Sequence, residues 1–361
     1  MIGHVPNHGG QLRNISGRFN IPVSQLLDFS ANINPDGPPP SVLLALRTCL
    51  DDASALTAYP DIEEVELKQA IADYIGVSPR NISVANGFIP LLQAALRALK
   101  IKHCLLPVPA FVEYRRTLEQ AGVEVELHVL TPDSNFCYDM DALKHGDHDA
   151  VLLANPQNPS GALTKKVDLL QFVSECAERN ITVLLDEAFC DYTPFVSLTQ
   201  YTHQYPNLIV FRSVTKFHGI PGLRVGYAVA NEAITCSLSY NLQPWPITIL
   251  ASHGVAAALA DQPFADRTRL HNDARKSHLK AALEGLGIHP YPSAANFLLL
   301  RLPRAINTNH FWHRMIVEHH LVLRDCSDYE ALPPGHLRIA VRSERDNEAL
   351  VRAVTLEFQK C

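Results

Sequence analysis

Short apolar runs alternate with longer amphipathic segments through the middle of the chain, from residue 82 to about residue 230. Each run has the length of a buried strand and is rich in leucine and β-branched residues, whereas the segments between the runs carry apolar residues at helical spacing. The segment 166–179, for example, predicts a helix. This alternation predicts an α/β fold with a mainly parallel sheet and helices on both of its faces. The predicted strands include 104–107, 150–154, 181–185, 208–211 and 225–229.

The two ends of the chain follow different patterns. Residues 1–35 are polar and turn-rich, so we expect an arm, and the prolines in 33–40 predict an extended segment. Apolar runs predict strands over 296–301 and 337–341. We therefore expect an N-terminal arm (1–40) that joins the small domain, a large domain (41–260) and a small C-terminal α+β domain (261–361). Helical spacing predicts helices over 41–47, 62–75 and 346–358, and a helix-rich connector over 247–286.

The composition is that of an ordinary globular enzyme. The 361 residues are 47% hydrophobic and 19% charged, with a formal net charge of −6 at pH 7. The negative charge and the lack of a basic stripe argue against a nucleic-acid partner. No apolar run approaches the ~20 residues needed to span a membrane. The eight cysteines show no metal-binding spacing, and no signal sequence is visible, so we expect a cytoplasmic protein with reduced thiols and no metal site.

The residues around Lys216 carry the clearest chemical signal. Lys216 follows the predicted strand 208–211 in a turn rich in glycine and proline, and α/β sheets bind ligands at the carboxyl ends of their strands. Ser213, Thr215 and Arg224 surround the lysine with donors for an anion. A lysine that forms a Schiff base with a phosphorylated aldehyde needs this combination, which favours pyridoxal 5′-phosphate (PLP) as the cofactor. The alternative is a solvent-exposed lysine in a loop.

Two further strand ends add groups that a PLP enzyme needs. The predicted strand 181–185 leads into Asp186, and a buried carboxylate there would keep the ring nitrogen of the cofactor protonated. The predicted strand 150–154 leads into a turn with Asn158, whose amide can donate to the ring O3′. Each has a plain alternative: a helix N-cap for Asp186 and an Asn-Pro turn for Asn158. Because Asn158, Asp186 and Lys216 occur together in this order along the chain, they favour a PLP enzyme with Lys216 and Asp186 as its catalytic residues.

The order of these motifs resembles a known family. The runs NPQNPSG (155–161), DEAF (186–189) and SVTKFHGIPGLRVGY (213–227) are similar to those of fold-type I PLP enzymes of the aminotransferase superfamily, in particular the histidinol-phosphate aminotransferase branch. Within that branch, segments along the whole chain resemble the L-threonine O-3-phosphate decarboxylases of cobalamin biosynthesis. The resemblance implies a fold-type I architecture, with a seven-stranded-type sheet domain plus a smaller α+β domain, and a homodimer with shared active sites.

The resemblance also implies roles on the cofactor side. Phe111 or Tyr114 is expected to stack on the PLP ring, and the resemblance points to Phe111. Tyr59 would reach the cofactor phosphate of the neighbouring subunit. Phe88 departs from the family, in which polar or acidic residues usually follow the Asn-Gly pair, so side-chain help with the phosphate is lost there. The expected phosphate donors are the backbone amides of Gly87 and Phe88 at a helix start, together with Ser213, Thr215 and Arg224.

The predicted substrate side is richer in cations than a simple amino-acid enzyme needs. Arg338 matches the carboxylate-binding arginine of the family and suits a bidentate contact. Arg324 and Arg342 belong to the same expected domain, and strand alternation places Arg338 and Arg342 on one face. A surface salt bridge is the alternative for each arginine. With His8 and Asn32 of the arm as further donors, we expect a phosphorylated amino-acid substrate.

Three departures from the aminotransferase branch bear on the reaction. Phe189 stands where those enzymes have a tyrosine, Ile33 where they have a glutamate, and Arg342 where they have a glycine. These differences favour PLP-dependent decarboxylation of O-phospho-L-threonine to (R)-1-amino-2-propanol O-2-phosphate and CO2, a step of cobalamin biosynthesis. Transamination of the histidinol-phosphate type is the alternative, and phosphoserine stays open as a substrate. A non-catalytic PLP-binding protein is a third hypothesis, which draws only on Phe88 and its two neighbours.

Overall fold

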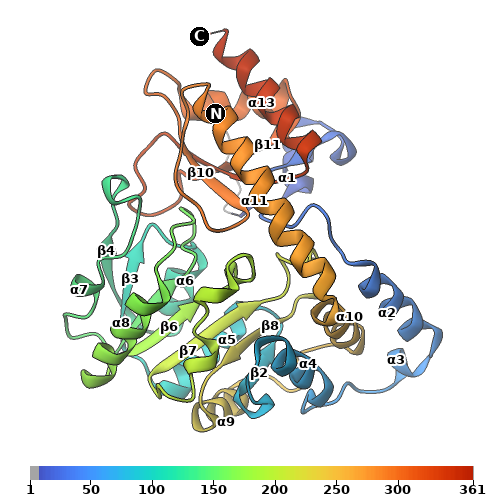
Figure 1. Ribbon diagram of the computed structural model, residues 1–361, viewed down its shortest axis with the longest axis vertical. Coiled ribbons are helices and arrows are strands. Elements are labelled where there is room, and N and C mark those ends of the chain that lie inside the picture. Colours follow the sequence, from blue (N-terminus) through green and yellow to red (C-terminus); the bar gives the residue numbers. More distant parts are fainter. Residues whose placement is uncertain (1–7, 361) are drawn as a thin grey trace.

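A seven-stranded sheet forms the middle of the larger, lower part of the computed structural model, which describes residues 8–360 (Figure 1). The strand order is β2-β8-β7-β6-β5-β3-β4. Neighbouring strands pair in parallel except where β8 is involved, which is antiparallel to both β2 and β7. The predicted α/β fold with a mainly parallel sheet is therefore confirmed. The strands are β2 (Ile82–Ala85), β3 (His103–Val108), β4 (Glu124–Val129), β5 (Ala150–Ala154), β6 (Thr182–Asp186), β7 (Leu208–Ser213) and β8 (Gly226–Val229).

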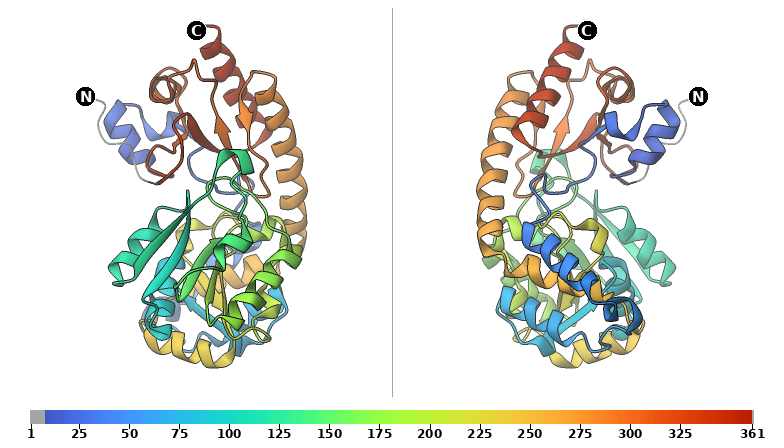
Figure 2. Two further views of the ribbon diagram at one scale, coloured as in Figure 1. Left: turned by 90° about the vertical axis from the view of Figure 1, so that its left-hand side faces the viewer. Right: turned by 90° about the vertical axis from the view of Figure 1, so that its right-hand side faces the viewer.

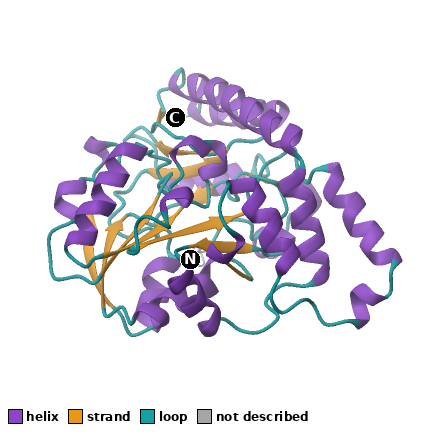
Figure 3. Cartoon of the chain, turned by 60° about the horizontal axis from the view of Figure 1, so that its bottom comes forward, coloured by secondary structure: helices purple, strands orange, loops and turns teal. Residues whose placement is uncertain are grey.

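Helices cover both faces of this sheet (Figure 3). Alternate residues of β5 separate two cores: Leu152 packs in the core that contains α5 and α6, whereas Val151 and Leu153 pack in the core that contains α8. A third core joins β2 and β8 to α2, α4 and α10. The helices are α2 (Pro40–Asp51), α3 (Ser54–Thr57), α4 (Val65–Ile75), α5 (Phe88–Leu99), α6 (Glu113–Gln120), α7 (Met140–Leu143), α8 (Lys166–Glu178), α9 (Glu232–Asn241) and α10 (Ile249–Ala260).

A smaller four-stranded antiparallel sheet, β12-β13-β10-β9, lies above the large sheet in Figure 1. The long helix α11 (Gln262–Glu284) runs along one side of the molecule from the large sheet to the small one (Figure 2). The core beside the small sheet draws on both ends of the chain, because Ile15 and Phe29 of the arm pack with residues such as Trp312 and Leu337. This packing supports our proposal that the arm joins the small domain.

The elements of this region are short apart from the helices that flank it. Strand β1 of the arm pairs in parallel with β11. The remaining elements are α1 (Leu12–Phe19), β1 (Leu27–Asp28), β9 (His289–Pro290), β10 (Phe297–Arg301), α12 (Thr308–Val317), β11 (Leu321–Val322), β12 (Arg324–Asp325), β13 (His336–Ala340) and α13 (Glu344–Phe358).

The structure differs from the sequence-based expectation at one strand end. β13 ends at Ala340, and Arg342 lies in the loop before α13. The prediction that Arg338 and Arg342 share a strand face is therefore wrong, because the pleat that would align them stops between the two residues. Among residues 8–360, no helix is both long enough and apolar enough to cross a membrane.

Candidate active site

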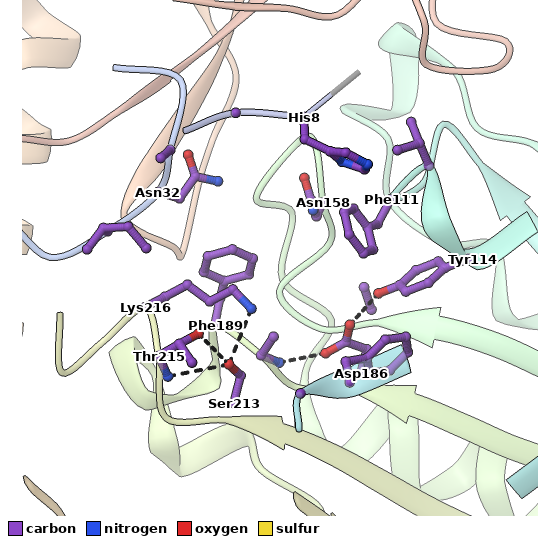
Figure 4. Close-up of a pocket in the computed structure, with 18 of the residues that line it drawn as sticks. His8, Asn32, Phe111, Tyr114, Asn158, Asp186, Phe189, Ser213, Thr215 and Lys216 are labelled. Carbon is purple, nitrogen blue, oxygen red and sulfur yellow. Dashed lines mark hydrogen bonds between the residues drawn. The ribbon is translucent and has the colours of Figure 1, made fainter. Parts of the chain in front are cut away.

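A cavity of about 370 Å³ opens between the carboxyl ends of the central strands, the arm and the small sheet (Figure 4). Its floor comes from residues that follow β5, β6 and β7, and its opposite wall comes from the arm and from β12 and β13. Most of the residues expected to form a site lie together here. The expected residues that line the cavity are His8, Asn32, Gly87, Phe88, Phe111, Asn158, Asp186, Ser213, Thr215, Lys216, Arg224, Arg324 and Arg338.

Lys216 lies on the floor of this cavity, directly after β7. Its Nζ donates to Ser213 Oγ at 3.3 Å and lies 5.6 Å from the centroid of the Phe189 ring. Burial lowers the pKa of the Lys216 ammonium group, while the charge of Asp186 acts in the opposite direction. A lowered pKa leaves a larger fraction of the amine unprotonated, and only the unprotonated amine can attack a carbonyl carbon.

Asp186 lies at the end of β6, beside Lys216. Its Oδ2 accepts a hydrogen bond from the Tyr114 hydroxyl at 2.5 Å, and its Oδ1 accepts one from the Ala188 amide at 2.8 Å. Burial raises the pKa of Asp186, and the neighbouring Lys216 and the two hydrogen bonds oppose this shift. The carboxylate is therefore a buried group that a cationic partner in the cavity, such as a protonated ring nitrogen, would stabilise.

An anion cradle lies at the start of α5. Gly87 has φ +89°, a backbone conformation that strains any residue with a side chain, and a Cβ there would lie 2.9 Å from Arg224 Nη2, so the guanidinium lies close to the helix start. The hydroxyls of Ser213 and Thr215 lie 2.8 Å apart on the same side of the cavity. Phe88 also lines the cavity, and its ring packs edge-on against Phe211 with ring centroids 5.2 Å apart. A guanidinium, hydroxyls and backbone amides together fit a phosphate group.

The groups expected around a planar ring are also present. Phe111 lines the cavity and packs edge-on against Tyr114, with ring centroids 5.5 Å apart. Since the Tyr114 hydroxyl is held by Asp186, Phe111 is the better candidate for stacking on a cofactor ring. Asn158 Oδ1 accepts a hydrogen bond from Arg338 at 2.6 Å, which ties the turn after β5 to the small sheet. The stacking role of Phe111 and the ring contact of Asn158 stay predictions.

Two arginines form the wall opposite Lys216. Arg324 of β12 and Arg338 of β13 are direct antiparallel partners, and both side chains are buried. Arg324 donates to both carboxylate oxygens of Asp328, at 2.9 and 2.7 Å. Arg338 donates to Asn158, to the Tyr329 hydroxyl at 3.0 Å and to a backbone carbonyl of the arm at 3.3 Å. Its Nε is buried without a partner within residues 8–360.

The arm closes the same wall from the other side. Asn32 is 6% exposed, and its Oδ1 has no hydrogen-bond partner among the described residues. His8 Nε2 lies 2.9 Å from a carboxylate oxygen of Glu113 in α6, so the arm reaches across the mouth of the cavity. In Figure 4, His8 and Asn32 lie on the opposite side of the cavity from Lys216 and Asp186.

Two expected site residues lie outside the cavity lining. Arg342 donates to Asp346 at 3.1 Å and to the backbone carbonyl of Asp28 at 3.0 Å, so its charge is already used in a local ion pair. Tyr59 is 81% exposed, and its ring lies 5.0 Å from that of Trp245. Its contact with a second subunit stays a prediction. The substrate role of Arg342 stays a prediction as well.

Tyr329 is a lining residue that sequence inspection did not select. It lies in the loop between β12 and β13, where its hydroxyl accepts from Arg338 and its ring lies 5.1 Å from the Arg324 guanidinium. No motif marks this loop, and Tyr329 is brought to the site only by the pairing of the two flanking strands. The sole local signal was an aromatic residue between two arginine-bearing strands.

Three comparisons with known proteins agree with this geometry. The family model for aminotransferase class I and II matches residues 24–354. The chain is 33% identical over 355 residues to the threonine-phosphate decarboxylase of Salmonella typhimurium strain LT2, covering 96% of this chain and 95% of that protein. The histidinol-phosphate aminotransferase from Clostridium acetobutylicum has a similar structure, with a TM-score of 0.86 and 28% identity over 93% of this chain and 100% of that one. The L-threonine-O-3-phosphate decarboxylase from Porphyromonas gingivalis gives a TM-score of 0.81 and 25% identity over 92% and 99%.

Proposed function

The chain belongs to the aminotransferase class I and II family and its cofactor is PLP, and from this premise we propose that it decarboxylates O-phospho-L-threonine for cobalamin biosynthesis. The products are (R)-1-amino-2-propanol O-2-phosphate and CO2. Bound PLP supplies the electron sink that accepts the electron pair from the bond broken at Cα. The side chains of this chain then decide which bond to Cα breaks.

The facing arginines of the small sheet carry this proposal. Like charges at directly opposed strand positions destabilise a sheet unless an anion offsets them. Asp328 offsets Arg324, but Arg338 contacts only neutral acceptors among residues 8–360. The charge of Arg338 is thus available to a substrate anion, and its unpartnered Nε offers a further donor. Arg338 therefore suits the carboxylate of a substrate, and Arg324, which lies directly opposite and is paired with Asp328, would add donors for a phosphate.

The wall and the floor would divide the work of the reaction. Arg338 would bind the substrate carboxylate and hold the Cα–carboxylate bond perpendicular to the cofactor ring, where its electron pair can enter the ring system. Arg324, His8 and Asn32 would bind the phosphate. On the floor, Lys216 Nζ would return a proton to Cα after CO2 leaves, and the Asp186 carboxylate would hold the proton on the ring nitrogen.

Transamination remains the alternative, because the comparisons include a histidinol-phosphate aminotransferase with a similar fold. In that reaction Lys216 would remove the Cα proton instead. Phe189 favours decarboxylation, since its ring lies beside Lys216 Nζ and brings no hydroxyl to the cavity. The 33% sequence identity to a protein named threonine-phosphate decarboxylase also favours decarboxylation.

We also propose a homodimer with shared active sites. Tyr59 and Trp245 form an aromatic pair on the surface, at 81% and 45% exposure, and large exposed aromatic rings favour contact with another protein surface. A second copy would cover this pair and bring Tyr59 to the partner's cofactor phosphate. Light scattering of the purified protein would detect a particle of twice the 40.0 kDa chain mass.

The test follows carbon dioxide and amino groups separately. PLP-loaded protein is incubated with O-phospho-L-threonine, with and without 2-oxoglutarate, while CO2 and the phosphorylated amine are measured by mass. Decarboxylation predicts equal CO2 release in both samples. Amino transfer to 2-oxoglutarate without CO2 would reject the proposal and favour the aminotransferase, which should then also act on histidinol phosphate.

A further inference from the structure

Asp186 accepts a hydrogen bond from a tyrosine of α6, a helix far from it in the sequence. The Tyr114 hydroxyl donates to Asp186 Oδ2 at 2.5 Å, the shorter of the two hydrogen bonds that the carboxylate accepts, and Figure 4 shows the hydroxyl aimed at it. Burial and the charge of Asp186 raise the pKa of Tyr114 well above its usual value. The phenol therefore stays protonated at neutral pH, so Tyr114 is the donor and the carboxylate is the acceptor.

Aromatic packing holds Tyr114 in this position. Its side chain is 2% exposed, and its ring lies between Phe88, with centroids 5.4 Å apart, and Phe111, at 5.5 Å. Phe88 is anchored in turn on Phe211 of β7. Phe88 is the residue that departs from the polar or acidic type expected after Asn86 and Gly87. Its ring contributes to the packing of Tyr114 and brings no polar group to the anion cradle.

The hydrogen bond from Tyr114 opposes the effect of burial on the pKa of Asp186. Burial raises the pKa of Asp186, which favours the neutral carboxylic acid, whereas the bond from Tyr114 lowers it and favours the carboxylate. The other charged groups that act on Asp186 are Lys216 and Arg212. Tyr114 is in turn influenced by Tyr138 and Tyr329 as well as by Asp186. Of these groups, Tyr114 is the one that directly donates a side-chain hydrogen bond to the carboxylate.

We propose that Tyr114 is a positioning residue that keeps Asp186 ionised and directed at the cofactor's ring nitrogen, and that Phe88 holds Tyr114 in place. Without the hydroxyl, the carboxylate becomes more basic, and the proton shared with the ring nitrogen moves toward Asp186. The inference rests on the proposed contact between Asp186 and the ring, and it does not depend on which bond at Cα breaks.

The test uses the Tyr114→Phe holoenzyme without substrate. The visible absorbance of the cofactor joined to Lys216 is followed against pH, because a positive ring nitrogen lowers the pKa of the nearby lysine-derived nitrogen. We expect the midpoint to move upward by about one pH unit, which is the size expected for one hydrogen bond to a charged group. With ¹⁵N-labelled cofactor, the ring-nitrogen signal should move toward the unprotonated value.

Tyr138 provides the matched control. Its side chain is half-buried, and its hydroxyl donates to the backbone carbonyl of Ala154 at 2.9 Å. Tyr138→Phe should lower the melting temperature about as much as Tyr114→Phe and leave the midpoint unchanged. A Phe88→Leu variant, which keeps the hydroxyl but loosens its packing, should move the midpoint in the same direction by a smaller amount.

Two results would overturn the inference. One is an unchanged midpoint in Tyr114→Phe, and the other is an equal shift in Tyr138→Phe. Because no substrate is present, this titration can fail while CO2 release from O-phospho-L-threonine is still observed. The reverse outcome, a shifted midpoint with no CO2 release, would reject the proposed reaction and leave the role of Tyr114 standing.

Discussion

The floor of the cavity comes from one sheet, whereas the wall opposite it comes from the arm and the small sheet. On the floor, Asp186 and Lys216 follow neighbouring strands, and each has a hydrogen-bond partner from the same region of the fold. On the wall, Asn32 Oδ1 and Arg338 Nε are buried and unpartnered among residues 8–360. The side chains of Asp186 and Lys216 thus have hydrogen-bond partners within the protein, while the wall still has buried polar atoms that a ligand can satisfy.

This difference teaches how the two regions contribute to function. Parallel strands fix the relative positions of Asp186 and Lys216 through the backbone ladder, which suits a cofactor that stays bound. The wall depends on contacts between segments far apart in the chain, such as the bond from Arg338 to Asn158. We therefore expect floor variants to lose the chemistry itself, and wall variants to change how the substrate is bound and oriented.

The largest effect is expected for Lys216→Ala. Loss of the amine removes both the bond to the cofactor and the proton donor to Cα, so the turnover rate should fall by roughly 10³-fold or more. The visible absorbance band of the lysine-bound cofactor should disappear as well, which a spectrum of the dialysed protein would detect. A variant with near-normal turnover would mean that the floor is not where the chemistry occurs.

Arg338→Gln should have the next largest effect. The glutamine keeps a donor but removes the charge that the substrate carboxylate needs, so kcat/KM should fall by roughly 10²-fold. Arg342→Gln is the control, because Arg342 is held by Asp346 outside the cavity lining. Steady-state kinetics of both variants decide the case: an equal loss for Arg342→Gln would show that the wall extends to this arginine.

A smaller effect is expected for Asn32→Ala. Losing one hydrogen bond to the substrate phosphate should raise KM by roughly tenfold without lowering the melting temperature. Asn34 is the comparison, since it is buried in the same arm but donates to Phe217 and Thr268 within the fold. Asn34→Ala should lower the melting temperature. If Asn32→Ala lowers the melting temperature instead, the role of Asn32 is structural and it is not a substrate contact.

The smallest effect is expected for Tyr59→Phe. The variant removes one hydroxyl that we expect to reach the partner's cofactor phosphate, so the dissociation constant of PLP should rise by about threefold to tenfold. Tyr240, which is 91% exposed, is the control, and Tyr240→Phe should leave PLP binding unchanged. Equal PLP affinity in the wild type and Tyr59→Phe would confine the phosphate site to one subunit.

The residues on the floor of the cavity could be predicted from the sequence for a physical reason. Asp186 and Lys216 each follow an apolar run, and the carboxyl ends of parallel strands meet at one edge of a sheet. The edge strand β4 was not predicted, because polar and apolar residues alternate along it, none of them is buried, and they form no apolar run. The hydrogen bond from Tyr114 of α6 to Asp186 at the end of β6 was also not predicted. It joins residues 72 positions apart and depends on the tertiary packing of α6.

The wall was predicted less completely. Arg324 and Arg338 were expected from their residue type, but their direct pairing depends on the register of β12 against β13. Arg342 was expected beside them because the strand was assumed to continue, whereas β13 ends at Ala340. Local sequence does not fix where a short strand ends or which loop residue, such as Tyr329, the pairing brings to the cavity.

The claim that the wall selects the Cα–carboxylate bond is tested most directly with O-phospho-L-threonine that carries deuterium at Cα. The holoenzyme is given one equivalent in ordinary water, and the aminopropanol phosphate is analysed by mass. If Arg338 orients the carboxylate as proposed, the product retains the deuterium and gains one hydrogen from Lys216. Loss of the deuterium to solvent, with or without CO2 release, would contradict the account, because it would mean that the Cα–H bond is the one the site breaks.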